Sequence, residues 1–255
     1  MIKTLQTVCN GLFDLDAAQG EIMVCGITCD SRKVKPGFVF AALAGEQVDG
    51  AKFAAKAAAA GAVAVVAAPD SDIDVPAHVV VLRHDQPRHA LARMAAAFYA
   101  SQPGCVVAVT GTNGKSSVVA FVRQMWQAMG LSGASLGTVG VTWAGGSEKL
   151  AHTTPDPVVL HDMLARLSAR GISHLALEAS SHGLEQNRLD GLSVCAGAFT
   201  NFSRDHLDYH ETEDAYFAAK MRLFDDILEP GATAVVNMDS PQAEKVAGHA
   251  EKADL

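Results

Sequence analysis

The chain has few cysteines, and their spacing argues against a disulfide or zinc framework. Its 255 residues include five Cys, an odd number, and none of them forms a C-x-x-C pair. Cys25 and Cys29 lie four positions apart, but no nearby His or Cys completes a zinc-binding set, so we interpret them as small core residues. This cysteine usage is typical of reduced thiols, and we expect a cytoplasmic protein.

Long apolar runs and an excess of positive charge are also missing. The first residues, Met1–Gln6, lack the apolar stretch of a signal peptide. The longest apolar run, Ala57–Ala68, is too short to span a bilayer, so we expect no membrane insertion. A net charge of −8 argues against a general nucleic-acid-binding protein, and we expect no nucleic-acid partner. A cationic pocket for a phosphorylated ligand remains compatible with this charge.

Hydrophobic residues make up 49% of the chain, which allows a substantial core and excludes global disorder. Strand and helix patterns alternate, which predicts an α/β fold with domains at 1–86 and 87–255 and a boundary near His84–Pro87. The first domain is predicted to be a small α/β unit with a helix at Ala51–Ala60 that Gly61 ends. Its predicted strands are Ile22–Ile27, Phe38–Leu43, Ala62–Ala67 and Val79–Leu82.

After a helix near Arg88–Ala100, the second domain is predicted to be a doubly wound, mostly parallel sheet. Ligands of such sheets bind beyond the carboxyl ends of the strands. The predicted strands after the first one are Ala134–Val141, His174–Leu177, Cys195–Phe199 and Thr233–Val236. The predicted helices are Ser116–Met129, Val158–Ala169 and Ala215–Leu228.

The strongest single motif is a phosphate-binding loop at Gly111–Ser117. The apolar run Val106–Val109 predicts a buried strand, and a Gly-rich turn then leads into a helix that opens on Lys115 and Ser116. Backbone N–H groups and the helix dipole would bind a phosphate of ATP or GTP there. Val109 replaces the first Gly of the usual loop, so the motif is shorter. An ordinary strand–turn–helix corner is the alternative.

Other polar residues follow the predicted strands. Glu178 ends an apolar run, and it is either a surface acid or, beside a phosphate loop, a ligand of Mg²⁺. Ser180–His182 lacks the G-x-S-x-G pattern of a hydrolase elbow. The segment 200–210 is dense in ionisable groups, and we interpret His210 there as structural. Lys220 is either a solvated lysine or one that burial keeps neutral.

Together these stretches resemble the Mur ligases, the ATP-dependent enzymes that form amide bonds in peptidoglycan precursor synthesis. Ser-Ser-His-Gly-Leu-x-Gln-x-Arg at 180–188 and Ser-Arg-Asp-His-Leu-Asp-Tyr-His at 203–210 most resemble the members that add the third amino acid to UDP-N-acetylmuramoyl-L-Ala-D-Glu. Further matching stretches are Asp30-Ser31-Arg32, Pro36-Gly37, Asp49-Gly50, Thr153-Thr154-Pro155, Ala219-Lys220 and Leu223-Phe224.

The resemblance implies a role for each matching residue. ATP is implied at the loop residues Gly111, Thr112, Asn113, Gly114, Lys115, Ser116 and Ser117. The first domain is implied to hold the UDP end of the substrate through Cys29, Ser31, Glu46, Gln47 and Val48. The muramoyl-peptide part is implied at His152, Thr153, Thr154, Ser180, Gln186 and Arg188. The implied catalytic residues are Lys115, Glu178, His206 and Lys220. One magnesium ion is implied at Ser116 and Glu178, and a second at His206 and a carbamylated Lys220.

The implied reaction activates the D-Glu carboxylate as an acyl phosphate, which the amine of a free amino acid then displaces. The family has a third domain, and the resemblance implies that a chain ending at Leu255 lacks it and the last part of the central domain, and is inactive alone. The segment that distinguishes diaminopimelate from lysine lies in that region, and diaminopimelate is the expected amino acid. Two alternatives stay open: the D-Ala-D-Ala-adding ligase, which Gln186 and Arg188 disfavour, and a nucleotide- or UDP-sugar-binding module without turnover.

Overall fold

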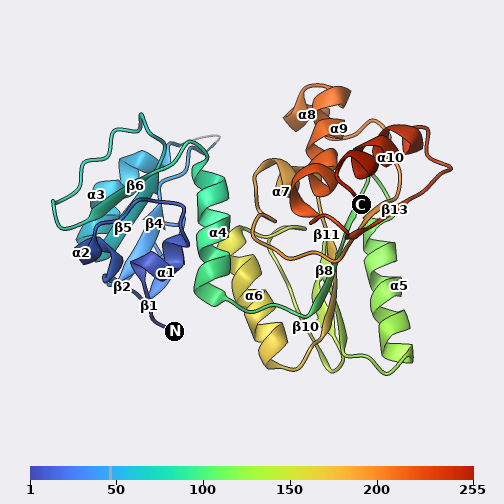
Figure 1. Ribbon diagram of the computed structural model, residues 1–255, viewed down its shortest axis with the longest axis horizontal. Helices are drawn as coiled ribbons and strands as arrows, with labels where there is room; N and C mark the ends of the chain where they lie inside the picture. The colour runs from blue at the N-terminus through green and yellow to red at the C-terminus, as the bar shows by residue number, and fades with distance from the viewer. Residues whose placement is uncertain (46–47) are drawn as a thin grey trace. The chain divides into compact units, whose positions relative to one another are not determined.

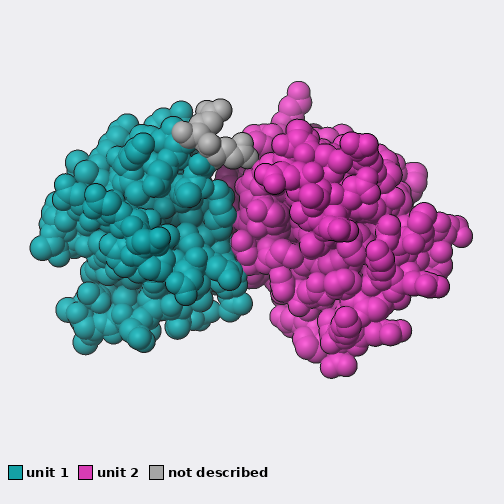
Figure 2. All heavy atoms as spheres, turned by 90° about the horizontal axis from the view of Figure 1, so that it is seen from above, with its two compact units in different colours: residues 1–100 teal, residues 101–255 magenta. Residues whose placement is uncertain are grey.

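The structure, a computed structural model, describes residues 1–45 and 48–255. The chain divides into two compact units, Met1–Ala100 and Ser101–Leu255, coloured teal and magenta in Figure 2. The division follows helix α4 (Pro87–Tyr99) instead of preceding it, because α4 packs against α1 (Leu5–Cys9) of the first unit. None of the helices that the structure describes combines the length and apolar character needed to cross a membrane.

The first unit is built on a parallel sheet in which β3, β4, β5 and β6 lie in sequence order. Figure 1 labels the last three of these strands. These strands are Gly26–Thr28, Phe38–Ala41, Ala62–Ala67 and Val80–Arg83. Strands β1 (Lys3–Thr4) and β2 (Met23–Val24) pair with each other in a separate two-stranded antiparallel sheet. The remaining elements are α2 (Ala17–Gly20), a 3₁₀ turn at Gly50–Phe53 and α3 (Ala54–Ala59).

Three sequence predictions for the first unit need correction. The predicted strand Ile22–Ile27 is broken at Cys25, whose N–H donates to the carbonyl of Gly37 instead of continuing a single ladder. The predicted helix Ala51–Ala60 begins as a 3₁₀ turn, because the Asp49 carboxylate accepts from the Ala51 N–H and fixes a tighter start. Cys25 and Cys29 are exposed and do not belong to the core.

The second unit is organised by a sheet with the strand order β10-β9-β8-β11-β7-β12-β13. Strands β8, β11, β7, β12 and β13 run parallel, and β9 and β10 form an antiparallel edge. In sequence order, β7 to β13 are Cys105–Thr110, Gly133–Gly137, Gly140–Trp143, Gly146–Glu148, His174–Glu178, Ala196–Phe199 and Thr233–Val236. The predicted strand Ala134–Val141 is therefore wrong: the chain reverses at Thr138 and Val139, and Gly140 adopts φ +98° on the return.

Helices α5 (Lys115–Ala128) and α6 (Pro157–Ala169) cover opposite faces of this sheet (Figure 1). The α6 face holds the larger core, which includes Leu160, Leu164 and Phe199. The predicted helix Ala215–Leu228 is α9 (Glu213–Arg222), which Thr212 caps and which continues into a π-helical turn at Leu223–Ile227. The other helices are α7 (Ser181–Glu185), α8 (Leu207–His210) and α10 (Ala243–Lys252).

Candidate functional site

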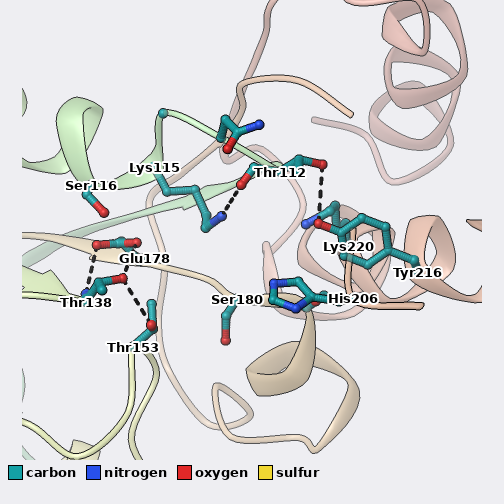
Figure 3. Close-up of a pocket in the computed structure, with 13 residues that line it drawn as sticks. Thr112, Lys115, Ser116, Thr138, Thr153, Glu178, Ser180, His206, Tyr216 and Lys220 are labelled. Carbon is teal, nitrogen blue, oxygen red and sulfur yellow. Dashed lines mark hydrogen bonds between the residues drawn. The ribbon is translucent and has the colours of Figure 1, made fainter. Parts of the chain in front are cut away.

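A cavity of about 270 Å³ lies at the carboxyl ends of β7, β8 and β11. All four residues implied to be catalytic line it: Lys115, Glu178, His206 and Lys220. Figure 3 shows Lys115 between Ser116 and Glu178 on one side and Tyr216 and Lys220 on the other. The cavity is also lined by the predicted residues Thr112, Asn113, Gly114, Ser116, Thr153 and Ser180.

The phosphate loop has a backbone that requires glycine. Gly111 adopts φ +139° and Gly114 adopts φ +85°, which side chains other than glycine rarely allow. A Cβ on Gly111 would also lie 2.0 Å from the Thr200 hydroxyl oxygen. Helix α5 begins at Lys115, directly after the turn, so the N–H groups of its first turn have no partner within the helix and lie at the end that borders the cavity. This is the arrangement that binds an anion such as a phosphate.

The segment after β12 braces this loop. The Thr112 N–H donates to the Asn201 carbonyl over 2.9 Å, and the Ser203 N–H donates to the Thr112 hydroxyl over 3.0 Å. The Thr200 hydroxyl and the Asn201 amide both donate to the Asn113 carbonyl, over 2.7 and 3.1 Å. The loop is therefore held in shape before any ligand arrives, which lowers the ordering cost of binding.

Two lysines share one backbone oxygen in the cavity. Lys115 Nζ and Lys220 Nζ donate to the Gly111 carbonyl over 2.8 and 2.9 Å, and Lys115 also donates to the Thr112 carbonyl. Burial lowers the pKa of the Lys115 amine, although Glu178 and Asp205 oppose the shift. Lys220 is 1% exposed, and burial together with the nearby Lys115 lowers its pKa to about 7. The cavity thus holds one half-buried amine and one fully buried amine that gives up its proton near neutral pH.

Tyr216 is a site residue that the sequence analysis missed. Its ring centroid lies 4.1 Å from Lys220 Nζ, within cation–π distance, and its hydroxyl donates to the Thr112 hydroxyl over 3.2 Å. Burial raises the pKa of the Tyr216 phenol. Tyr216 precedes Lys220 by one helical turn, and this i, i+4 spacing is the signal that could have identified it.

Glu178 is 1% exposed and accepts two hydrogen bonds from one residue. The Thr138 N–H donates to it over 2.9 Å and the Thr138 hydroxyl over 3.3 Å. A Cβ on Gly137 would lie 1.9 Å from a carboxylate oxygen of Glu178, so only glycine leaves room for this side chain. Thr138 was also missed, and no sequence signal identifies it because its backbone donates the shorter bond.

The oxygen donors of the cavity fit magnesium. Within residues 1–45 and 48–255, no group of three or more His, Cys, Asp or Glu side chains could hold a metal by itself. Ser116 and Glu178 nevertheless line the same cavity and supply a hydroxyl and a carboxylate. Mg²⁺ takes one or two carboxylates and completes its shell with phosphate oxygens and water, so a sparse oxygen set suits it.

His206 directly precedes α8 as its N-cap residue, adopts φ +51° and lines the cavity. Its ring centroid lies 4.9 Å from that of His182 and 6.0 Å from that of Tyr216. Its Nε2 lies 3.6 Å from the Asp205 carboxylate. His210 is buried and its Nε2 shares a 2.9 Å hydrogen bond with the Ser181 hydroxyl, which agrees with a structural residue.

A polar network extends from the cavity to Arg188. The Thr154 hydroxyl donates to the Glu178 carbonyl over 2.9 Å. Arg188 donates to the Thr154 carbonyl and to the Gln186 side-chain oxygen, both over 2.7 Å, and the Gln186 amide donates to the Tyr209 hydroxyl over 2.8 Å. Three residues implied to hold substrate are therefore linked to the residue that carries the buried carboxylate.

Other predicted positions lie away from the cavity lining. Ser117 and His152 are exposed in the second unit. In the first unit, Cys29 and Ser31 follow β3, and the exposed Val48 follows the neighbouring parallel strand β4. Cys29 and Ser31 therefore lie just beyond the carboxyl end of β3. Glu46 and Gln47 lie outside the residues that the structure describes.

Two protein-family models match the chain. Residues 24–99 match the model of the Mur ligase family, catalytic domain, and residues 109–255 match the Mur ligase middle domain. The chain is 54% identical over 220 residues to a UDP-N-acetylmuramoyl-L-alanyl-D-glutamate–2,6-diaminopimelate ligase of Brucella melitensis, which covers 86% of this chain and 45% of that protein. A ligase of the same name from Agrobacterium fabrum is 51% identical over 236 residues, 92% of this chain and 47% of that protein.

Solved structures extend the likeness. A diaminopimelate ligase structure of the same name superposes with a TM-score of 0.85 at 32% identity and covers 100% of this chain and 51% of its own. MurF from Acinetobacter baumannii shares the fold, with a TM-score of 0.61 at 17% identity over 99% of this chain and 52% of its own. The chain spans about half the length of the curated relatives it matches. With two matching domain models and relatives above 50% identity, the chain belongs to the Mur ligase family.

Proposed function

We propose that this chain supplies the substrate- and nucleotide-binding parts of an ATP-dependent ligase that adds meso-diaminopimelate to UDP-N-acetylmuramoyl-L-Ala-D-Glu in peptidoglycan precursor synthesis. The observation that carries the proposal is the convergence of Lys115, Glu178, His206 and Lys220 on one cavity at the start of α5. The names of the relatives from Brucella melitensis and Agrobacterium fabrum support the choice of substrate. The nucleotide substrates and the reduced thiols favour the cytoplasm as its location.

The loop Gly111–Ser117 binds the phosphates of ATP in this proposal. Backbone N–H groups at the start of α5 face the phosphate oxygens, and Lys115 replaces its bonds to the Gly111 and Thr112 carbonyls with bonds to the outer phosphates. The substrate D-Glu carboxylate attacks the γ-phosphate and becomes an acyl phosphate. The amine of the incoming amino acid then attacks the acyl carbon, and inorganic phosphate leaves. Lys115 stabilises the negative charge that develops during phosphoryl transfer.

Ser116 and Glu178 would hold one magnesium ion, and His206 with a carbamylated Lys220 would hold a second. Bound magnesium neutralises phosphate charge and orients the phosphates for in-line attack. The chain holds two of these side chains in place: Thr138 orients the Glu178 carboxylate, and Tyr216 and the Gly111 carbonyl hold the Lys220 amine beside the loop.

The remaining residues bind the UDP-muramoyl-dipeptide. Arg188 offers a bidentate fork to a carboxylate or phosphate, and Gln186 and Thr154 hold its guanidinium in place. Thr153 and Ser180 line the cavity where the D-Glu carboxylate must reach the γ-phosphate, and His152 lies next to Thr153 in sequence. Cys29, Ser31 and Val48, together with Glu46 and Gln47, bind the UDP end at the edge of the first sheet.

The main test is Lys115→Ala. Calorimetry with this chain should show that the substitution weakens binding of ATP at least about tenfold, while the affinity for UDP-N-acetylmuramoyl-L-Ala-D-Glu stays within about twofold. In the full-length gene product, phosphate release that depends on ATP, the UDP-dipeptide and diaminopimelate should fall at least about a hundredfold.

Lys245→Ala, which removes an exposed amine from α10, is the matched control and should leave both measurements unchanged. Near-normal turnover of Lys115→Ala would contradict the proposal. Binding of both ligands without phosphate release by the full-length wild type would favour a module without turnover. Preference for a UDP-muramoyl-tripeptide with D-Ala-D-Ala would favour the other ligase.

We also expect Lys220 to carry a carbamate at neutral pH in the presence of bicarbonate. A pKa of about 7 leaves a large share of its amine neutral and able to attack carbon dioxide, and the resulting anion relieves repulsion from Lys115. The measurement is a carbamate signal in NMR with ¹³C-bicarbonate that disappears in Lys220→Met and persists in Lys245→Ala. An unmodified Lys220 amine under these conditions would rule out its role as a metal ligand.

A further inference from the structure

Two cysteines meet at the opposite edge of the central sheet from the cavity. Cys105 begins β7, and Cys195 directly precedes β12, the strand beside it. Their Sγ atoms lie 2.9 Å apart although the residues are 90 positions apart in sequence. A disulfide bond is about 2.05 Å long, so the two sulfurs need to approach by only about 0.9 Å.

We propose that Cys105 and Cys195 form a modification site, a dithiol that closes to an intramolecular disulfide when the protein meets a peroxide. The backbone already favours this geometry, because the Cys195 N–H donates to the Val106 carbonyl over 2.8 Å and fixes the two strand starts against each other. To form the disulfide, the Cys195 thiol gives up a weak hydrogen bond to the Val106 carbonyl at 3.2 Å.

Exposure assigns the two thiols different roles. Cys195 is exposed and Cys105 is half-buried, so the oxidant reaches Cys195 first. Burial, with the neighbouring Cys195 thiol adding to it, raises the pKa of Cys105 to about 12, which keeps Cys105 protonated while Cys195 reacts. Cys105 therefore stays a thiol until it attacks the oxidised Cys195, and this second step is the slower one because the thiolate is the better nucleophile.

The chemistry balances with one peroxide. The Cys195 thiolate attacks a peroxide oxygen and breaks the O–O bond, which yields a Cys195 sulfenic acid and a hydroxide that takes up the thiol proton as water. Cys105 Sγ then attacks the Cys195 sulfur, and the sulfenic hydroxyl leaves as a second water with the proton of Cys105. Two thiols are oxidised by two electrons in total, and the peroxide is reduced to two waters.

The position of the pair predicts its effect. β7 runs from Cys105 to Thr110, about 17 Å, before the phosphate loop begins at Gly111. A bond between the strand starts therefore leaves the loop in place. It closes a long loop of chain, and such cross-links stabilise proteins mainly by restricting the unfolded state. The site is thus a redox-responsive clamp on the sheet and not a block of the cavity.

The test treats the reduced 255-residue chain with a stoichiometric amount of hydrogen peroxide and follows thiols, intact mass and disulfide-linked peptides. We expect free thiols to fall from five to three, with the loss of two hydrogen atoms in mass and a peptide that links Cys105 to Cys195. The thermal midpoint should rise by about 5–15 °C and return after treatment with dithiothreitol.

Two variants make the result specific. Cys195→Ser should abolish the link, whereas Cys25→Ser, which removes another exposed thiol, should retain it. In Cys105→Ser the reaction should stop at a Cys195 sulfenic acid that dimedone traps. Wild-type protein that gains oxygen on Cys195 without a link, or that links other cysteine pairs equally well, would overturn the proposal.

Discussion

Two basic side chains are buried in two different regions of the second unit. Lys220, on α9 beside the phosphate loop, is 1% exposed, and His161, on α6, is 3% exposed. Burial lowers the pKa of both groups, of Lys220 to about 7 and of His161 to about 4. By these measures the two residues look alike.

Their surroundings differ. Lys220 lines a cavity, donates to the Gly111 carbonyl and lies over the Tyr216 ring. In the part of the chain that the structure describes, His161 Nε2 has no hydrogen-bond partner, and the side chain does not line the site cavity. A lowered pKa therefore marks burial, whereas access to a cavity together with convergent polar groups marks a candidate site. Three substitutions test this distinction.

Lys220→Met should produce the largest change in stability. The folded-state pKa of Lys220 is below the value of 10.5 for a free lysine, so protonation favours the unfolded chain. Relative to the variant, the wild type should have its full stability above pH 10.5 and lose it as the pH falls toward 7. The loss is about 5 kcal/mol, because the pKa falls from 10.5 to about 7 and each pKa unit corresponds to about 1.4 kcal/mol.

The measurement is the difference in unfolding free energy between Lys220→Met and wild type from pH 6 to 10.5, in buffers free of carbon dioxide so that the amine stays unmodified. Lys245→Ala is the control for loss of an exposed amine. A difference that does not change with pH would show that Lys220 is hydrated in solution and that the comparison with His161 fails.

The part of this site that sequence could predict is the part built from strand ends. Phosphate-loop residues and Glu178 follow apolar strands whose carboxyl ends must meet at one edge, and the structure places Lys115 and Glu178 on one cavity. Lys220 was ambiguous because a lysine in a helix is usually solvated, and only the packing of α9 against the loop buries it. Thr138 could not be predicted, since its backbone N–H is common to nearly every residue type.

The fold shows the same limit. Strand β13 begins and ends at the predicted residues, Thr233 and Val236. Strand β11 is also predicted to within one residue, because an uninterrupted apolar run indicates a buried strand. The hairpin of β8 and β9 is predicted as one strand because its turn is only two residues long, Thr138 and Val139, and neither they nor the flanking Gly137 and Gly140 clearly interrupt the strand pattern in the sequence. The end of β8 lies against the Glu178 carboxylate, and this contact joins residues far apart in sequence.

His161→Leu should produce a smaller change in a different pH range. The folded-state pKa of about 4 lies below the ordinary 6.5, although a backbone hydrogen bond with Asp190 partly opposes the shift. The wild type should therefore have its full stability above pH 6.5 and lose about 3 kcal/mol relative to the variant as the pH falls to 4. Chemical denaturation of both proteins across this range measures the difference.

The control is His78→Leu, which replaces an exposed histidine in the first unit and measures the general effect of replacing His by Leu. Nucleotide affinity of His161→Leu should equal that of the wild type, in contrast to Lys115→Ala, because His161 is not part of the cavity lining. A loss of nucleotide binding in His161→Leu would show that the core base contributes to the site and would remove the distinction drawn above.

Asp156→Ala should produce the smallest change in stability. It measures what a hydrogen-bonded polar side chain contributes at the start of α6, the helix that contains His161. The Asp156 carboxylate caps α6 by accepting from the N–H groups of Val158 and Val159, over 3.0 and 3.2 Å. Removing such a cap costs about 1 kcal/mol of unfolding free energy at pH 7. Asp156→Asn, which keeps the acceptor oxygen without the charge, should retain most of that stability. If both variants lose the same unfolding free energy, the negative charge at the start of α6 matters more than the hydrogen bonds. Asp156 would then set an electrostatic scale for the stability change of His161→Leu, and not a hydrogen-bonding one.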